Sequence, residues 1–362
     1  MANKHGTLSE LFTNIANAIR SKTGSTQEII ADNFPTEISN LRTGFDYNNQ
    51  SATTISDYEF YNCTDLKSVD CYNLTSVGTS AFENCSNLKS VILYDGVESV
   101  DENAFKGCNE DLVIFYKGSS APESWHENWN PDNCTVIFGD LVETWNISAT
   151  ENDSVTAYLC AINNNDYTLY VYGNGNVDDY DSASQVPWVS YRNNIVEIIM
   201  NDNVTSIGNR VFYKCTSLTS ITIPDSVTSI GRFAFCDCNR LTSVTIGGSV
   251  TSIGFSAFNG CSSLTSITLP DSVTSIGERA FEYCYKLTSI NIPDSVTNIG
   301  AYAFSETNLT SITYTGTVAK WNAINFNAVW AFDTPNYTIH CTDGDIAKDG
   351  TITYHTTSGG EN

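Results

Sequence analysis

LTSITIPDSVTSIGRFAFCDCNR, residues 218–240, is one copy of a unit that recurs along the second half of the chain with a period of 23 residues. Phenylalanine returns at one place in each unit, at Phe212, Phe235, Phe258, Phe281 and Phe304. Leucine keeps the same period at Leu218, Leu241, Leu264 and Leu287, and Leu309 arrives one residue early. A fixed period of this length predicts a solenoid, in which each unit forms one coil that stacks on its neighbours.

The spacing inside one unit predicts the course of one coil. Leu218, Ile221 and Ile223 form an LxxLxL pattern, and the alternation at its end predicts a short strand with one apolar face. Residues 224–226, Pro-Asp-Ser, predict a turn, and the Ala-Phe-x-x-Cys step that follows predicts a helical turn with Phe and Cys inside. Each coil buries about six apolar side chains, at roughly 1.5–3 kcal/mol each before entropy is subtracted, so only stacked coils are expected to be stable.

A weaker array precedes the main one, and both arrays carry a cysteine three residues after the repeated phenylalanine. The first array has Phe60, Phe82 and Phe105 at this place. The cysteines of both arrays are Cys63, Cys85, Cys108, Cys215, Cys238, Cys261 and Cys284. Free cysteine packs as a small hydrophobe, and it recurs here once per coil, so we predict reduced core thiols instead of a disulfide framework.

The units resemble the BspA-type leucine-rich repeats of bacterial surface antigens, strongly over residues 204–313 and more loosely over residues 60–115. Residues 144–200 are similar to the β-rich lead-in that often precedes such arrays, and residues 319–324 and 340–344 are similar to their closing cap. The resemblance implies a mainly β leucine-rich-repeat solenoid with short helical turns. It also implies a role in adhesion or recognition, without defining the ligand.

Residues 1–44 lack the repeat and predict a small helical module. Thr7 and Glu10 stand at the spacing of a helix N-terminal capping box, and Leu8, Leu11, Phe12, Ile15 and Ile19 then fall on one helical face. This segment resembles a module at the start of tail and fibre-like proteins of bacteriophages. The resemblance implies virion attachment or oligomerisation, and a helical cap on the first coil is the alternative.

These patterns divide the chain into five parts. They are a helical attachment or capping module (1–44), a short first repeat array with its cap (45–139), a β-rich lead-in (140–200), the main leucine-rich repeat array (201–315), and a C-terminal cap with a β-hairpin tail (316–362).

Composition and charge limit the possible partners. The 362 residues are 41% hydrophobic, which is enough for a sizeable core, and 17 Lys+Arg against 41 Asp+Glu give a formal net charge of −24. Such a surface repels phosphate backbones, so we expect no nucleic-acid partner. No segment approaches the roughly 20 apolar residues of a membrane span, and residues 1–10 lack the apolar run of a secretory signal. Residues 204–314 hold seven acidic and six basic residues, and this near-neutral array suits glycan or protein recognition.

Comparison of the coils with each other separates framework positions from free ones. The two residues before each Ala-Phe pair and the two after it vary most. The candidate binding residues there are Tyr213, Lys214, Arg232, Phe233, Phe255, Arg279, Tyr283 and Tyr302. Exposed aromatic rings at these places suit a sugar or a protein partner, although they could also merely cover the outer edge. The second candidate is the strand face, a ladder of hydroxyl side chains from Ser220 to Asn291, which could equally serve only to solvate a sheet.

The sequence holds no motif for catalysis. None of its four histidines stands in a pattern with a nucleophile or a metal ligand, and no P-loop, GxGxxG or nucleophile elbow occurs. We therefore expect a binding protein without enzymatic activity, cofactor or metal.

The sequence leads to one preferred role and two alternatives. The preferred role is a receptor-binding or adhesion component of a phage tail, located in the virion, with residues 1–44 toward other tail proteins and the repeats toward a host-surface glycan or protein. The first alternative is a bacterial cell-surface or secreted adhesin of the same repeat family. The second is a purely structural spacer.

Overall fold

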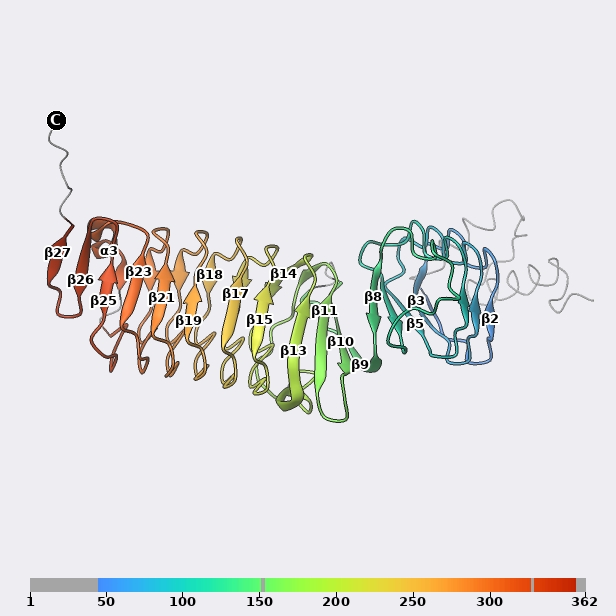
Figure 1. Ribbon diagram of the computed structural model, residues 1–362, viewed down its shortest axis with the longest axis horizontal. Helices are drawn as coiled ribbons and strands as arrows, with labels where there is room; N and C mark the ends of the chain where they lie inside the picture. Colours follow the sequence, from blue (N-terminus) through green and yellow to red (C-terminus); the bar gives the residue numbers. More distant parts are fainter. Residues whose placement is uncertain (1–44, 151–153, 327–328, 356–362) are drawn as a thin grey trace, which may run out of the picture. The chain divides into compact units, whose positions relative to one another are not determined.

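The described part of the chain forms two compact units, with the division between Phe138 and Gly139. The computed structural model describes residues 45–150, 154–326 and 329–355 (Figure 1). The helical module predicted for residues 1–44 lies outside these described residues. The finer division into five parts stays a prediction.

The second unit carries the main array as two ladders of parallel strands (Figure 1). One ladder contains β15 (Ser220–Ile223), β17 (Ser243–Ile246), β19 (Ser266–Thr268), β21 (Ser289–Ile292), β23 (Ser311–Tyr314) and β25 (Thr338–His340), and its hydrogen bonding is interrupted between β17 and β19. The other contains β12 (Gly175–Asn176), β14 (Val204–Ile207), β16 (Ser229–Ile230), β18 (Ser252–Ile253), β20 (Ser275–Ile276), β22 (Asn298–Ile299) and β24 (Asn325–Phe326). Ser220 pairs with Ser243 and Ser252 with Ser275, so one repeat position forms one column along the array. The predicted leucine-rich-repeat solenoid with 23-residue repeats is confirmed.

Both ends of the second unit are covered. A four-stranded sheet precedes the array, in the order β13 (Ile195–Met200), β11 (Tyr167–Tyr172), β10 (Thr156–Ala161) and β9 (Asp140–Asn146). At the other end, β25 pairs antiparallel with β26 (Gly344–Ala347), which pairs with β27 (Ile352–Tyr354). The short helix α3 (Val318–Asn322) follows the N-cap residue Thr317, whose side chain accepts a hydrogen bond from the backbone of Lys320.

The first unit is a shorter solenoid of the same construction. Its main ladder runs in the order β1 (Phe45–Tyr47), β3 (Leu66–Asp70), β5 (Ser90–Leu93), β7 (Val113–Tyr116) and β8 (Thr135–Phe138), all parallel. A second ladder contains β2 (Thr54–Ile55), β4 (Ser76–Val77) and β6 (Ser99–Val100). The loosely repeated residues 60–115 therefore fold as true coils.

Stacked phenylalanine rings form the axis of each core. In the second unit, the rings of Phe235, Phe258, Phe281 and Phe304 are almost parallel, with interplanar angles of 2–3° and centroids 5.2–5.4 Å apart. All four side chains are fully buried. Each array ends in the same way, because the last phenylalanine meets a tryptophan edge-on at 5.9 Å: Trp129 against Phe105, and Trp330 against Phe304. A shared core and a shared closure make the two arrays directly comparable.

The repeated cysteines form a second buried column beside the phenylalanines. All twelve cysteines of the chain are free. Five of the seven repeated cysteines are buried, as the packing argument predicted, and Cys63 and Cys108 are half-buried. The Cys261 thiol donates a hydrogen bond to the Phe235 carbonyl at 3.2 Å, and the Cys85 thiol donates to the Phe60 carbonyl at 3.0 Å. Each such thiol therefore fills space and also satisfies a buried carbonyl of the preceding coil.

Candidate functional site

The variable positions of the sequence lie on one side of each coil. We call this side the turn edge. In every coil we define it as the two residues before and the two residues after the pair that the repeated phenylalanine forms with its preceding residue, which is alanine in most coils. The second residue before the phenylalanine and the second residue after it have positive φ throughout, for example 57° at Phe233 and 61° at Asp237. We call these the left-handed positions. Non-glycine residues pay roughly 1–2 kcal/mol for this conformation.

Hydrogen bonds between coils impose the left-handed conformation whatever the side chain. In the second unit, Phe233 N donates to Phe255 O at 2.9 Å and Tyr283 N donates to Ser305 O at 3.1 Å. In the first unit, Asn62 N donates to Glu83 O at 2.8 Å in the same way. The backbone geometry of the turn edge is thus a property of the repeat, and only the side chains differ between coils.

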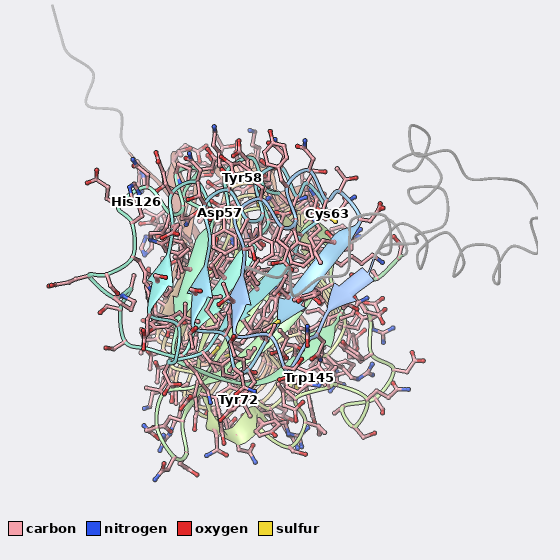
Figure 2. All side chains as sticks on the ribbon, turned by 90° about the vertical axis from the view of Figure 1, so that its right-hand side faces the viewer. Asp57, Tyr58, Cys63, Tyr72, His126 and Trp145 are labelled. Carbon is pink, nitrogen blue, oxygen red and sulfur yellow. The ribbon has the colours of Figure 1, made fainter. Side chains whose placement is uncertain are left out.

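The first array fills its left-handed positions mainly with residues that tolerate them. They are Tyr58, Asn62, Ser80, Asn84, Asn103 and Gly107. Asparagine and glycine visit this region at low cost, so four of these six positions favour stability. The large exception, Tyr58, belongs to the first described coil. Figure 2 shows it on the side of the coil opposite to Tyr72. Its ring meets that of the exposed Tyr61 at 5.7 Å, so this array carries one aromatic pair on its turn edge.

The second array fills the same positions mainly with long side chains. They are Arg210, Lys214, Phe233, Asp237, Ser256, Gly260, Arg279, Tyr283, Tyr302 and Glu306. A bulky residue with positive φ is a true conformational outlier, and outliers of this kind collect where side chains have a function. The turn edge of the second array therefore holds side chains that local stability would replace by asparagine or glycine.

The candidate residues before the Ala-Phe pair stand in close contact across coils. The rings of Phe233 and Phe255 meet at 5.1 Å in an edge-to-face arrangement. The guanidinium of Arg210 lies over the Phe233 ring at 4.8 Å, and that of Arg232 lies over the Phe255 ring at 5.1 Å. Arg279 lies over Tyr302 in the same way at 5.0 Å. The aromatic rings predicted to contact a ligand thus hold cations against the edge.

The candidate residues after the pair are further apart. The Tyr213 ring has Lys214 at 5.2 Å and Arg192 at 5.9 Å from its centre. Lys214 also faces Asp237, with 3.8 Å between the ammonium nitrogen and the carboxylate. Tyr283 is 39% exposed and has Tyr285 as its ring neighbour, at 5.9 Å. The candidate residues after the pair therefore form separate contacts and do not gather into one cluster.

Arg279 joins the two sides of the edge through acidic partners. Its guanidinium lies 3.4 Å from Glu278 and 3.3 Å from Glu282. Glu282 is 5% exposed and also accepts a hydrogen bond from Asn259 at 3.0 Å. Burial raises the pKa of the Glu282 carboxyl, and the partners Arg279 and Asn259 act in the opposite direction. Arg279 is therefore neutralised within the protein.

Sequence reasoning missed Arg210 and Arg192. Arg210 occupies the same repeat position as Phe233, one coil earlier, so the repeat alignment alone could have found it. Arg192 precedes the repeats, in a 3-10 turn at Arg192–Asn194, and no periodic signal marks it. Both stand over aromatic candidates, which gives them a place in the site.

The second candidate, the strand face, also forms as predicted. Ser220 and Thr222 point outward from β15, while Ile221 and Ile223 are buried. A shallow groove of about 240 Å³ lies at the start of this face, between β13 and β15, and Glu197, Asp202, Ser220 and Thr222 are among its lining residues. These two strands belong to different hydrogen-bonded sheets, which leaves space between their outward side chains. The groove is open, apolar side chains form the larger part of its lining, and it holds two carboxylates and no basic residue.

Reactive chemistry finds little support among the described residues. Burial raises the pKa of the Cys85 and Cys215 thiols to about 12, so these groups stay protonated and are poor nucleophiles at neutral pH. In the described ranges, no group of three His, Cys, Asp or Glu side chains is placed to hold a metal ion. No helix in the described part of the chain has the length and apolar character needed to cross a bilayer.

Comparison with solved structures found several repeat proteins. A leucine-rich repeat protein from Eubacterium ventriosum is 28% identical over 49% of this chain and 45% of its own length, with a TM-score of 0.41; this chain thus spans less than half of that protein. A leucine-rich cell surface protein from Faecalibacterium prausnitzii is 22% identical over 77% of this chain and 90% of its own (TM-score 0.37). A leucine-rich repeat protein from Bacteroides ovatus is 19% identical over 80% of this chain and 92% of its own (TM-score 0.36).

Comparison with curated proteins gave no match. The family model described as "BspA type Leucine rich repeat region" matches six times, over residues 9–118 and 205–329. These two segments cover most of the chain and include the stacked phenylalanines of both arrays. The chain therefore belongs to the BspA-type leucine-rich repeat family.

Proposed function

We propose that the chain is a non-enzymatic adhesion protein of a bacterial surface that binds a glycan or protein partner through the turn edge of its second array. The observation that carries this proposal is the set of long side chains at left-handed positions, among them Phe233, Arg279, Tyr283 and Tyr302. Stability alone would favour asparagine or glycine there, as in most of the first array. Leucine-rich repeats serve chiefly as binding scaffolds, which agrees with this interpretation.

The bacterial-surface interpretation replaces the phage-tail role as the preferred one. The family is that of a bacterial surface antigen, and its first match begins at residue 9, inside the segment that resembled a tail module. The structures named above are repeat proteins, one of them a cell surface protein. Antibody labelling of intact cells of the source organism, compared with labelling of purified virions from the same culture, tests the location directly. Signal on the virions alone would restore the tail role.

A binding experiment with a matched set of variants tests the turn edge. The full chain is applied to a glycan array and to intact host cells, beside a variant that combines Phe233→Asn, Tyr283→Asn and Tyr302→Asn. Asparagine tolerates the left-handed conformation, so this variant is expected to fold. We expect binding to weaken at least tenfold. The control Tyr58→Asn makes the same change in the first array and is expected to bind as the wild type does.

The strand face provides the competing site. A variant with Thr245→Ala and Thr268→Ala removes two exposed hydroxyls of that ladder and leaves the turn edge unchanged. Loss of binding in this variant, with normal binding of the turn-edge variant, would move the site to the strand face. Normal binding by every variant would favour the role of a structural spacer.

A further inference from the structure

Two arginines of the turn edge, and Arg192 beside it, have no acidic partner, although the chain is rich in acids. Asp and Glu outnumber Lys and Arg by 41 to 17. Arg279 and Lys214 each face a carboxylate within 4.0 Å. Among the described residues, no carboxylate lies that close to Arg192, Arg210 or Arg232. In so acidic a protein, an unpaired arginine is available to an anion from outside.

Two of these arginines form one compact patch with two phenylalanines. Arg210 N donates to Arg232 O at 2.9 Å, so the two residues lie on adjacent coils. Their guanidiniums stand over Phe233 and Phe255, whose rings touch each other. We call Arg210, Arg232, Phe233 and Phe255 the arginine-phenylalanine patch. All four side chains are at least partly exposed, and Arg232 is the most open of them.

The aromatic rings hold the guanidiniums in place and leave their N–H groups available. Stacking occupies the face of a guanidinium, while its five N–H donors point outward in its plane. One of them, at Arg210 Nη1, donates to Tyr180 O at 2.8 Å, which fixes the side chain further. Carboxylates match this planar fork in geometry and can accept two parallel hydrogen bonds. The patch is thus prepared for an anionic group that comes with an apolar face.

The backbone of the edge is not available to a partner. Arg210 N and Phe233 N both donate to the next coil, and the corresponding carbonyls accept those bonds. An extended peptide bound by strand addition needs free main-chain donors and acceptors. A sugar instead uses side-chain hydrogen bonds and packs its apolar face on aromatic carbon. The patch therefore fits a sugar better than an acidic peptide.

We propose that the arginine-phenylalanine patch binds a carboxylate-bearing sugar of an acidic polysaccharide. The two guanidiniums receive the carboxylate, and the exposed parts of Phe233 and Phe255 contact the ring carbons of the sugar. This inference rests on the proposed function and specifies the ligand class of the same edge. Because the second array as a whole is near-neutral, attraction is local and falls with ionic strength.

The test measures binding of the full chain to four polymers by biolayer interferometry at 50 mM and 500 mM salt. The polymers are polygalacturonate, dextran sulfate, dextran and polyglutamate. We expect polygalacturonate to bind at least tenfold more tightly than each of the other three, and to weaken at the higher salt. The variant Arg210→Gln with Arg232→Gln is expected to lose this binding at least tenfold. Phe233→Leu with Phe255→Leu, which keeps both charges, is expected to lose it at least threefold.

Matched controls separate the patch from general charge. Arg240→Gln with Lys286→Gln removes two exposed cations of the same array outside the patch and is expected to leave binding unchanged. Binding of polyglutamate or dextran sulfate as tight as that of polygalacturonate would overturn the proposal, because the patch would then recognise negative charge and not a sugar. Absence of polygalacturonate binding would also overturn it. If the asparagine variant of the turn edge still loses binding to cells in that case, the proposed function stands and only the ligand class is wrong.

Discussion

The two arrays share a framework and differ at the turn edge. In both arrays the phenylalanine rings of adjacent coils stack on each other, and a column of cysteine thiols lies beside them. In both, the ring of a tryptophan packs edge-on against the last phenylalanine. Both impose left-handed backbone at the same two positions of each coil. At these positions the first array has mostly asparagine and glycine, and the second array has mostly long side chains, chiefly arginine, lysine, phenylalanine and tyrosine. In a repeat protein, some coils carry a residue other than the one with the lowest conformational cost at a fixed backbone position. Such a position points to the surface that binds a partner.

The largest expected effect tests the shared framework. Phe258→Ala removes a fully buried ring that stacks on Phe235 and Phe281, and Phe82→Ala removes its counterpart in the first array. Each change is expected to lower the free energy of unfolding of its own unit by about 3–5 kcal/mol. Thermal unfolding followed by circular dichroism, with limited proteolysis to assign the unit, measures this. A loss below 1 kcal/mol in one unit only would mean that the two cores are not equivalent.

The cysteine column should behave alike in both arrays, with a smaller effect. Cys261→Ala and Cys85→Ala each remove a thiol and leave a carbonyl, at Phe235 or Phe60, without that donor. We expect each to lower the free energy of unfolding by roughly 1–3 kcal/mol, because packing and a buried hydrogen bond are lost together. Serine at the same place keeps a donor and should recover part of the loss. Serine variants no more stable than the alanine variants would show that the thiol acts by volume alone.

Sequence reasoning found the framework because every coil repeats it. The positions of Phe235 and Cys238 follow from their period, and their burial follows from apolar packing. The same period marked the turn edge as variable. It could not show that the backbone there is left-handed, since this depends on hydrogen bonds between coils. Nor could it show that Arg210 and Arg232 stand over Phe233 and Phe255, because only the stacked structure brings these side chains together.

A reciprocal exchange tests the turn-edge comparison itself. Tyr283 and Asn84 both occupy the left-handed position two residues after the phenylalanine, with φ of 63° in each case. Tyr283→Asn is expected to raise the free energy of unfolding of the second unit by about 1 kcal/mol, because asparagine tolerates this conformation. Asn84→Tyr should lower that of the first unit by a similar amount and also break the bond from Asn84 to Asn62.

Denaturant unfolding of the two single variants and the wild type gives both values. The double variant serves as the control, because the two positions belong to different units and their effects should add. A loss of stability in Tyr283→Asn would contradict the comparison. It would show that the tyrosine contributes more by packing on Tyr285 than it costs by its backbone.

The smallest expected effect concerns the pH dependence of the second unit. Burial raises the pKa of Glu282, so the folded chain holds this proton more tightly than the unfolded chain does. Between the ordinary carboxyl pKa and the raised one, the folded state binds more protons, and stability therefore falls as the pH rises through this window. Glu282→Gln should remove that fall, so its melting temperature should drop less between pH 4 and pH 7 than that of the wild type. Glu83→Gln, at the same repeat position of the first array beside Lys106, controls for the loss of a carboxylate as such. An unchanged pH profile in Glu282→Gln would mean that Arg279 and Asn259 fully offset the cost of burying this charge.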